Sequence, residues 1–499
     1  MKKTIALRSA VCTAALLTST SVMADVTASE VWADWHKTLE VYGADNVIAG
    51  SETVDGDTLT ISDVTMIVAD EYSNISSQIG PIVFSENGDG SVSVSLPESY
   101  IMALNIEDDL IVDLEIFQDN LAITASGDPD AINYEFTVDA YGVRVAEFKG
   151  ETNEIEGDVF FQTNNVSGSY QSGNGPSQTM AYSMLAESAD VLFDIKEPSG
   201  DGYVLFSGKT QGLAMDGSMA APDGVDFNDP DTMFANGFAV DSTLGYLGGE
   251  FLADFNIDGE AGVFTFQMGE GGFNVGMDAS RISYGFSFDG VNVNAQVPDL
   301  PFPVTFSWDQ AETAFNMPVA SSDISEAFGF KFALTEVAVS DEIWAMADPA
   351  GLIPRDPISI ILDVSGMGKL FFDLLDPEQA EAMAFADVPG EVESLSLGNL
   401  LLSAAGAEIQ GTGDFIFDNT DLETFDGLPR PAGELNVSIK GANALIDSAV
   451  EMGLLPQEQA GMGRLFMGMF TTPTGDDELT SKIEINDEGH VMANGQRIQ

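Results

Sequence analysis

The feature that most constrains this chain is a strict alternation of apolar and polar side chains, which recurs in short segments from residue 46 to residue 310. Residues 91–96 are a clear case, with valine or leucine at every second position between serines. Successive side chains of a strand point to opposite faces, so this alternation predicts strands with one buried face. Turn sequences such as Asp55-Gly56 and Gly88-Asp89-Gly90 join such strands into antiparallel hairpins. We therefore predict a large antiparallel meandering sheet, or two stacked sheets.

The number of alternating segments exceeds what one small sandwich needs, and 50 glycines are consistent with many tight turns. Further segments of this kind are 57–62, 111–117, 134–138, 143–148, 159–162, 203–206, 251–257, 263–268 and 282–288.

Helical patterns occur near both ends of the chain. Thr27 followed by Glu30 is a capping-box pattern, so we predict an amphipathic helix over residues 28–42 that Trp32 and Trp35 dock on a sheet. After residue 310, strands and helices interleave. The fold class predicted is β-rich α+β, a large antiparallel meandering sheet with a few docking helices, more helical toward the C-terminus. The helices predicted in this second region are 322–328, 368–375, 377–385, 442–455 and 457–470.

A cluster of prolines at positions 298, 301 and 303 lies where the sequence changes from strands alone to interleaved strands and helices. It predicts an N-terminal helix plus antiparallel β region over residues 25–310 and an α+β region over residues 311–499.

Residues 1–24 have the layout of a secretory signal peptide cleaved after Ala24. A short positive start is followed by an apolar stretch and then by small residues. The protein is therefore expected in the periplasm, with secretion as the alternative, and no later stretch has the length of a transmembrane segment. The only cysteine, Cys12, lies inside the signal, so the mature chain can form no disulfide and no thiolate metal site.

The chain is strongly acidic, with 81 acidic and 17 basic residues and a net charge of −64. The first 24 residues carry three of the cations and no acid, so the mature chain has 14 basic residues and a net charge near −67. Such a charge repels nucleic acid, which is excluded as a partner, and also anionic headgroups. Because 44% of the residues are hydrophobic, the chain is expected to fold as a soluble protein. A lipid or an envelope protein remains as a partner.

No catalytic constellation is present. The mature chain has only two histidines, His36 and His490, near opposite ends, and neither a zinc-protease nor a nucleophile-elbow motif occurs. Gly366-Met367-Gly368-Lys369 resembles the end of a phosphate loop, but Asp363 stands in place of the first glycine. We predict a protein that is not an enzyme and needs no cofactor. A hydrolase with an unrecognised carboxylate site is an alternative, since acidic pairs are too abundant to single one out.

Asp254, Asn256, Asp258 and Gly259 match the start of a calcium-binding EF-hand loop. The twelfth position is Thr265 rather than the bidentate glutamate, and the flanking residues alternate as strands do. A β-hairpin with an Asp258-Gly259 turn explains the same residues. Both interpretations stay open, and a calcium-stabilised structural or interaction protein of the envelope is an alternative function.

Aromatic residues also alternate, at Phe264, Phe266, Tyr284, Phe286 and Phe288. They are the buried face of a sheet or, in the alternative, the lining of a groove for a lipid. Our leading functional hypothesis is a non-enzymatic periplasmic protein that binds an apolar envelope ligand or partner on a large β-sheet.

One further set of segments extends across essentially the whole mature chain, at 31–35, 56–60, 340–346, 348–357, 441–447, 452–456 and 493–497. Together these segments resemble domain-of-unknown-function family 2125. The resemblance implies an exported protein of a kind frequent in marine alphaproteobacteria, with no assigned activity and no catalytic residues to carry over. At the level of fold alone, the chain is also distantly similar to AsmA-like envelope proteins, some of which are linked to lipid handling.

Overall fold

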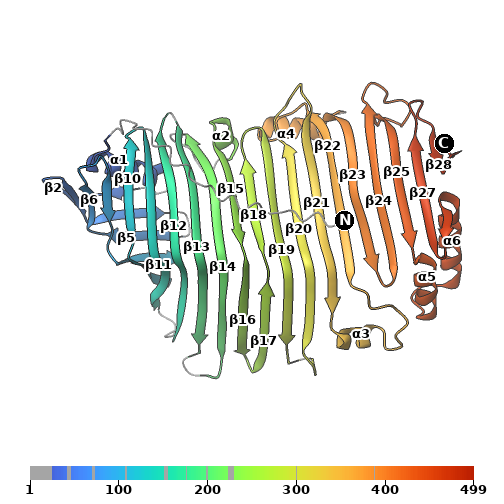
Figure 1. Cartoon of the computed structure of the whole chain (residues 1–499), viewed down its shortest axis with the longest axis horizontal. Helices are drawn as coiled ribbons and strands as arrows, with labels where there is room; N and C mark the ends of the chain where they lie inside the picture. The colour runs from blue at the N-terminus through green and yellow to red at the C-terminus, as the bar shows by residue number, and fades with distance from the viewer. Residues whose placement is uncertain are drawn as a thin grey trace.

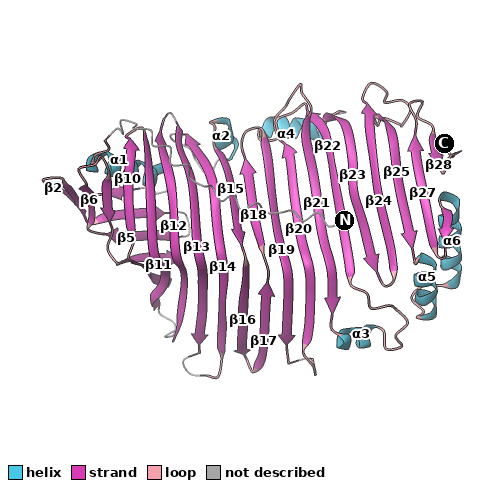
Figure 2. Ribbon diagram, in the orientation of Figure 1, coloured by secondary structure: helices cyan, strands magenta, loops and turns pink. Residues whose placement is uncertain are grey.

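The structure is a computed structural model that describes residues 25–41, 46–69, 73–106, 110–150, 156–175, 177–197, 200–222, 230–298, 300–386 and 388–499. The predicted signal peptide, residues 1–24, lies outside the described residues. Within them, 29 strands join into one sheet that extends along the longest axis of the molecule (Figure 1). Figure 2 shows that helices lie at the ends and edges of this sheet. The predicted fold class, a large antiparallel meandering sheet with a few helices, is confirmed.

From β11 to β25 neighbouring strands are antiparallel and follow sequence order apart from β15–β18, and β25 then pairs with β27. β15 and β16 continue one line beside β14, and β17 and β18 continue one line beside β19. β20 spans residue 310, so strand pairing is continuous there, and the domain boundary stays a prediction. The strands are β11 (Ala131–Gly150), β12 (Glu156–Asn174), β13 (Ser177–Lys196), β14 (Tyr203–Pro222), β15 (Ala239–Tyr246), β16 (Gly248–Ile257), β17 (Glu260–Met268), β18 (Gly271–Met277), β19 (Arg281–Gln296), β20 (Val304–Pro318), β21 (Glu326–Val339), β22 (Ile358–Leu370), β23 (Gly390–Ala404), β24 (Ala407–Asp418), β25 (Arg430–Lys440), β26 (Thr472–Gly475), β27 (Glu478–Ile485), β28 (Val491–Ala493) and β29 (Gln496–Arg497).

The first ten strands and α1 (Ala28–Val41) form what we call the N-terminal cap. β11 pairs with β10 along its first half and with β9 along its second half, so two arms of the sheet diverge from this strand. Both arms fold behind the long strands at the blue end of Figure 1. The cap strands are β1 (Asn46–Ile48), β2 (Ser51–Asp55), β3 (Thr58–Ser62), β4 (Val64–Ala69), β5 (Ser73–Ile79), β6 (Ile82–Glu86), β7 (Val92–Ser95), β8 (Ser99–Ile106), β9 (Leu110–Asp119) and β10 (Ala122–Asp128).

The densest hydrophobic core lies inside this cap. Trp32 of α1 packs among buried side chains that include Ile61 and Phe84. The Trp35 indole nitrogen donates to the Tyr170 hydroxyl at 3.1 Å, which ties the helix to β12. The capping box is present, since the Thr27 amide donates to Glu30 at 2.8 Å. The prediction that the two tryptophans dock this helix on a sheet is confirmed.

A buried carboxylate fixes the position of α1. Asp34 is only 3% exposed and accepts hydrogen bonds from Tyr134 at 2.7 Å, Ser172 at 2.7 Å and Asn174 at 2.9 Å. Burial, together with the Asp34 carboxylate, raises the pKa of Tyr134, so its hydroxyl remains a donor. Since buried polar groups are costly when unpaired, this network holds the helix in one place over β11 and β12.

Two of the remaining helices match the prediction closely, α4 (Pro377–Ala384) and α6 (Gln457–Phe470). α5 (Ala442–Glu451) ends earlier than predicted, shortly before Gly453, which has a φ of 73°. α2 (Pro230–Ala235) and α3 (Asp341–Ala347) were not predicted.

The helices predicted at 322–328 and 368–375 are wrong. β21 already begins at Glu326, and residues 368–370 complete β22. Phe328 lies opposite Gly366 in the ladder between these two strands. Pairing with a neighbouring strand therefore overrides the local helical pattern.

A line of irregular residues, which we call the crease, crosses the meander at one level. The β11–β12, β13–β14 and β19–β20 ladders skip one residue on each strand there without a change of register, whereas the β21–β22 ladder shifts register between Leu334 and Val337. Four residues on the crease have left-handed backbone conformations, with φ of 48°, 64°, 60° and 52°. These residues are Asn165, Gly212, Gly290 and Glu336.

At the crease the alternation changes phase. In a regular strand, one residue separates neighbouring side chains on the same face. On β11 two residues separate Val138 from Tyr141, yet both side chains line the same cavity. The predicted strands 134–138 and 143–148 are consequently two halves of one strand of 20 residues. A period-two pattern that shifts by one residue looks like a strand boundary in the sequence.

Replacing Asp34 with alanine is expected to destabilise the protein by about 3 kcal/mol, because three buried donors lose a charged acceptor. Thermal or urea unfolding followed by tryptophan fluorescence would measure this loss. Asp55→Ala, at the exposed end of β2, is the matched control. An Asp34 variant as stable as the control would contradict the assigned role.

Candidate ligand-binding face of the sheet

The long strands place apolar side chains on one common face. Residues directly opposite each other in an antiparallel ladder point to the same side, so a row can be followed from strand to strand. One row crosses the meander from β11 to β27 and consists almost entirely of apolar residues. In order it contains Phe136, Gly168, Met184, Met215, Leu244, Phe273, Phe286, Thr313, Phe332, Leu362, Leu400, Gly411, Val437 and Ser481.

A second apolar row runs on the other side of the crease. Its Phe251 and Phe266 rings lie 5.9 Å apart, and Gly208 leaves the space that the Phe251 ring occupies. We call the surface formed by the two rows and their same-side neighbours the apolar face. The second row contains Val143, Phe161, Val191, Gly208, Phe251, Phe266, Val293, Phe306 and Val339.

The opposite side of the sheet, which we call the polar face, has a different composition. The row that begins at Glu135, next to Phe136 on β11, shows this difference, because small and polar side chains predominate in it. This row contains Glu135, Ser169, Ser183, Asp216, Thr243, Asn274, Gly285, Ala314, Lys331, Asp363 and Asn399.

Much of the apolar face is in contact with solvent. Phe161, Phe273 and Phe286 are exposed to 47%, 46% and 37%. All five aromatic residues singled out in the sequence lie on this face, two on one side of the crease and three on the other. Large apolar patches that remain in water mark sites where a partner or ligand binds.

An apolar cavity of about 580 Å³ opens where the two arms of the cap diverge from β11. Side chains from both sides of the crease line it, among them Val138 and Met184 from one side and Val143 and Phe161 from the other. Its volume falls within the range of about 300 to 1,000 Å³ that is typical of small-molecule sites. The cavity therefore joins the apolar face to the interior of the cap.

The cavity wall is uncharged. Its polar atoms include the hydroxyls of Tyr141, Tyr170 and Thr163. Burial raises the pKa of Tyr141, and burial also raises the pKa of Tyr170 although the hydrogen bond from Trp35 opposes the rise. Both phenols stay protonated at physiological pH, so the wall suits a hydrocarbon rather than an ion.

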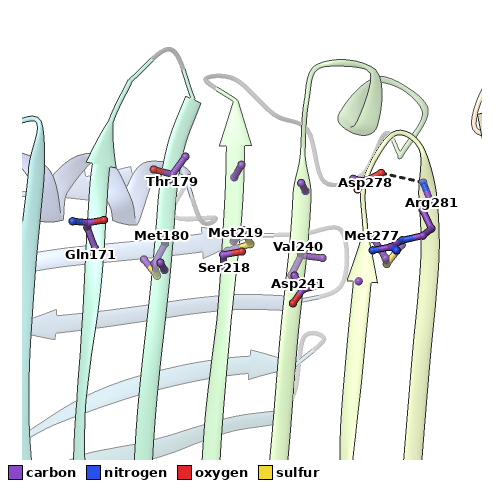
Figure 3. Close-up of a pocket in the computed structure, with 14 residues that line it drawn as sticks. Gln171, Thr179, Met180, Ser218, Met219, Val240, Asp241, Met277, Asp278 and Arg281 are labelled. Atoms are coloured by element: carbon purple, nitrogen blue, oxygen red, sulfur yellow. Dashed lines mark hydrogen bonds between the residues drawn. The ribbon is translucent and has the colours of Figure 1, made fainter. Parts of the chain in front are cut away.

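The polar face carries depressions of its own. Figure 3 shows one of about 270 Å³ near the ends of β12–β15, β18 and β19. Ser218 and Asp241 lie opposite each other there, and Arg281 stands at the rim. The Arg281 amide donates to Asp278 at 3.0 Å, so this carboxylate is occupied by the turn itself.

A second depression of about 350 Å³ on the polar face contains the carboxylates of Glu270, Asp289 and Glu312. Burial raises the pKa of Asp289, and the two neighbouring carboxylates raise it further. Burial, aided by Asp289, raises the pKa of Tyr246 to about 12. Lys331 balances part of this charge by an ion pair with Glu312 at 2.6 Å.

The calcium candidates lie on one hairpin. Asp254 and Asn256 belong to β16, and Asp258 occupies the turn to β17 with a φ of 54°. The Asp254 carboxylate accepts from the Tyr203 hydroxyl at 2.8 Å, and the Asn256 amide donates to the Asp201 carbonyl at 3.0 Å. Among the described residues, no three or more histidine, cysteine or acidic side chains are grouped to hold a metal ion.

The two histidines lie at opposite ends of the sheet. His36 Nε2 is 3.2 Å from the Val47 carbonyl oxygen inside the cap. His490 Nδ1 lies 3.4 Å from a Glu488 carboxylate oxygen in the turn between β27 and β28. The geometry brings neither histidine to the apolar face, and the hydrolase alternative stays a prediction.

The fold and the face together define a class, an elongated antiparallel sheet with one solvent-exposed apolar side and a cap at one end. Residues 250–495 match the model of the family described as "Uncharacterized protein conserved in bacteria (DUF2125)". This match confirms the predicted family resemblance over residues 250–495, whereas the segments 31–35 and 56–60 lie outside the matched range. No curated protein and no solved structure matches the chain, so the likeness to AsmA-like proteins stays a prediction.

Helices able to cross a bilayer are not found in the described ranges, since each one there is too short or too polar.

The hairpin interpretation of Asp254, Asn256 and Asp258 predicts that calcium leaves the protein's stability unchanged. We expect melting temperatures in millimolar calcium and in chelator to agree within about 1 °C, since only a ligand of the folded state shifts them. A rise in calcium that Asp258→Asn abolishes would establish the metal site instead.

Asp289→Asn is expected to raise the melting temperature near pH 7 by about 1–2 °C. The folded chain holds this proton more tightly than the unfolded chain, so stability is lost as pH rises above the ordinary carboxyl value of 3.8. The gain should therefore disappear near pH 3, where the carboxyl is protonated in both states. Glu260→Gln, at the exposed start of β17, is the control, and a gain that persists at low pH would refute the assignment.

Proposed function

We propose that this chain is a non-enzymatic periplasmic protein that binds amphiphilic lipids, with their hydrocarbon chains lying against the apolar face. One observation carries the proposal: the first apolar row continues from β11 to β27 and the second from β11 to β21, while Phe161, Phe273 and Phe286 in these rows remain exposed. The cavity beside β11 supports it, because it offers an enclosed site of the same chemistry at the capped end.

The energetics favour a hydrocarbon ligand. Covering apolar surface contributes roughly 25 cal/mol for each Å² removed from water, and each buried methylene contributes about 0.8 kcal/mol. The face presents few hydrogen-bonding side chains, so it distinguishes hydrocarbon from polar ligands rather than one headgroup from another. The net charge of −64 disfavours strongly anionic headgroups, which leaves neutral and zwitterionic lipids as the preferred class.

A charge placed on the apolar face tests the proposal. Phe161→Asp should weaken binding of a fluorescent C16 fatty-acid ester by at least about tenfold, since a carboxylate in contact with hydrocarbon must be desolvated. Leu185→Asp is the matched control, because Leu185 is 56% exposed on the neighbouring strand but belongs to the polar face. Native mass spectrometry of the purified protein should also reveal bound lipid.

A protein that carries no lipid and does not bind the probe would contradict the proposal. Equal losses in the Phe161 and Leu185 variants would also contradict it, because binding would then not depend on the apolar face. Circular dichroism and melting temperature identify any variant that fails to fold.

A further inference from the structure

The helix α6 lies at the end of the sheet opposite the N-terminal cap. It directs its polar side toward the protein and its apolar side toward solvent. Its inner side is held by polar contacts, since Arg464 donates to the Asn443 side chain at 3.1 Å and pairs with Asp447 of α5 at 2.6 Å. Ala460, on the same side, is 1% exposed. The carbonyl of Phe470, at the end of the helix, accepts from Ser481 of β27 at 2.7 Å. These contacts fix the orientation of the helix on the protein.

The outer side of α6 is an apolar stripe formed by Met462, Leu465, Phe466 and Met469. Their spacing of three, four and seven residues places them on one side of the helix, where a soluble protein normally buries its apolar residues. Here they are between 59% and 70% exposed. Leu454, in the turn before the helix, is 69% exposed.

The distribution of charge around this stripe indicates what kind of surface it can contact. Residues 459–475 contain no acidic side chain, and Arg464, their only charged residue, is engaged on the inner side. The rest of the chain carries a net charge of about −65, so a second copy would meet strong repulsion. A surface that is apolar beneath and electrically neutral on average, such as a zwitterionic bilayer, carries no such penalty.

The position of the stripe agrees with a surface contact. α5 and α6 lie at the red end of the sheet, opposite the N-terminal cap (Figure 1). β27, which follows the helix, still belongs to the apolar face through Leu479 and Ile483. Gly461, Gly463 and Gly468 have nothing within 4 Å of the position of a Cβ, so the flanks of the stripe are open.

We propose that the stripe of α6, with Leu454, inserts into the interfacial region of a zwitterionic membrane and anchors the C-terminal end of the sheet there. The contact is separate from ligand binding on the apolar face, because it uses side chains of a helix that points away from the protein.

Flotation of the purified protein with phosphatidylcholine vesicles tests this inference. The protein should float with the vesicles at both about 0.05 M and about 0.5 M sodium chloride, since the contact is apolar and not screened by salt. The double variant Leu465→Ser/Phe466→Ser should lose at least about tenfold in partitioning, because two large apolar side chains no longer enter the membrane. The double variant Ile324→Ser/Phe385→Ser is the control, since it removes two equally exposed apolar residues elsewhere.

Failure of the unaltered protein to float would overturn the inference, as would flotation of the α6 variant at the unaltered level. Light scattering provides a further check: a concentration-dependent dimer that the α6 variant abolishes would assign the stripe to self-association instead. Binding of the fatty-acid ester should be unchanged in the α6 variant. The two proposals can therefore fail independently.

Discussion

The structure depends on one constraint, the register of its antiparallel hydrogen-bond ladders. Side chains opposite each other across a ladder must share a face, so an apolar residue on one strand adds to the apolar row of the next. From β11 to β27 the register carries Phe273, Phe286 and Phe332 into a single row. A sheet built in this way has one side that water does not solvate well, and our functional proposal rests on how that side is covered.

The chain covers part of this side itself. At the N-terminal end, α1 and two arms of the sheet close over the long strands, and the Asp34 network fixes the helix in place. The crease lets the apolar rows continue past a change of phase, so the cavity receives side chains from both sides of it. Beyond the cap, Phe273 and its neighbours remain exposed, and this is the surface on which we propose that a lipid binds.

The sequence predicted the strands well and their lengths poorly. Alternation in residues 134–138 and 143–148 is real, yet the left-handed residue on the neighbouring strand, Asn165, belongs to a crease that only strand pairing defines. The helix α1 was predicted from its capping box and residue spacing, and α6 was also predicted within its observed bounds, because such helical patterns are local signals. The helix predicted at 322–328 failed because Phe328 pairs across β21 and β22, and such pairing is not a local property.

By itself the sequence determined that the chain forms many antiparallel strands, that it is highly acidic, and that amphipathic helices lie near both of its ends. These properties follow from side-chain period and charge, which neighbouring residues in the chain already contain. Only the tertiary structure decided that Tyr284, Phe286 and Phe288 stay exposed while Phe264 and Phe266 are half-buried, and that the stripe of Leu465 and Phe466 points outward. Exposure depends on residues distant in the sequence, because a side chain is buried only by what folds against it.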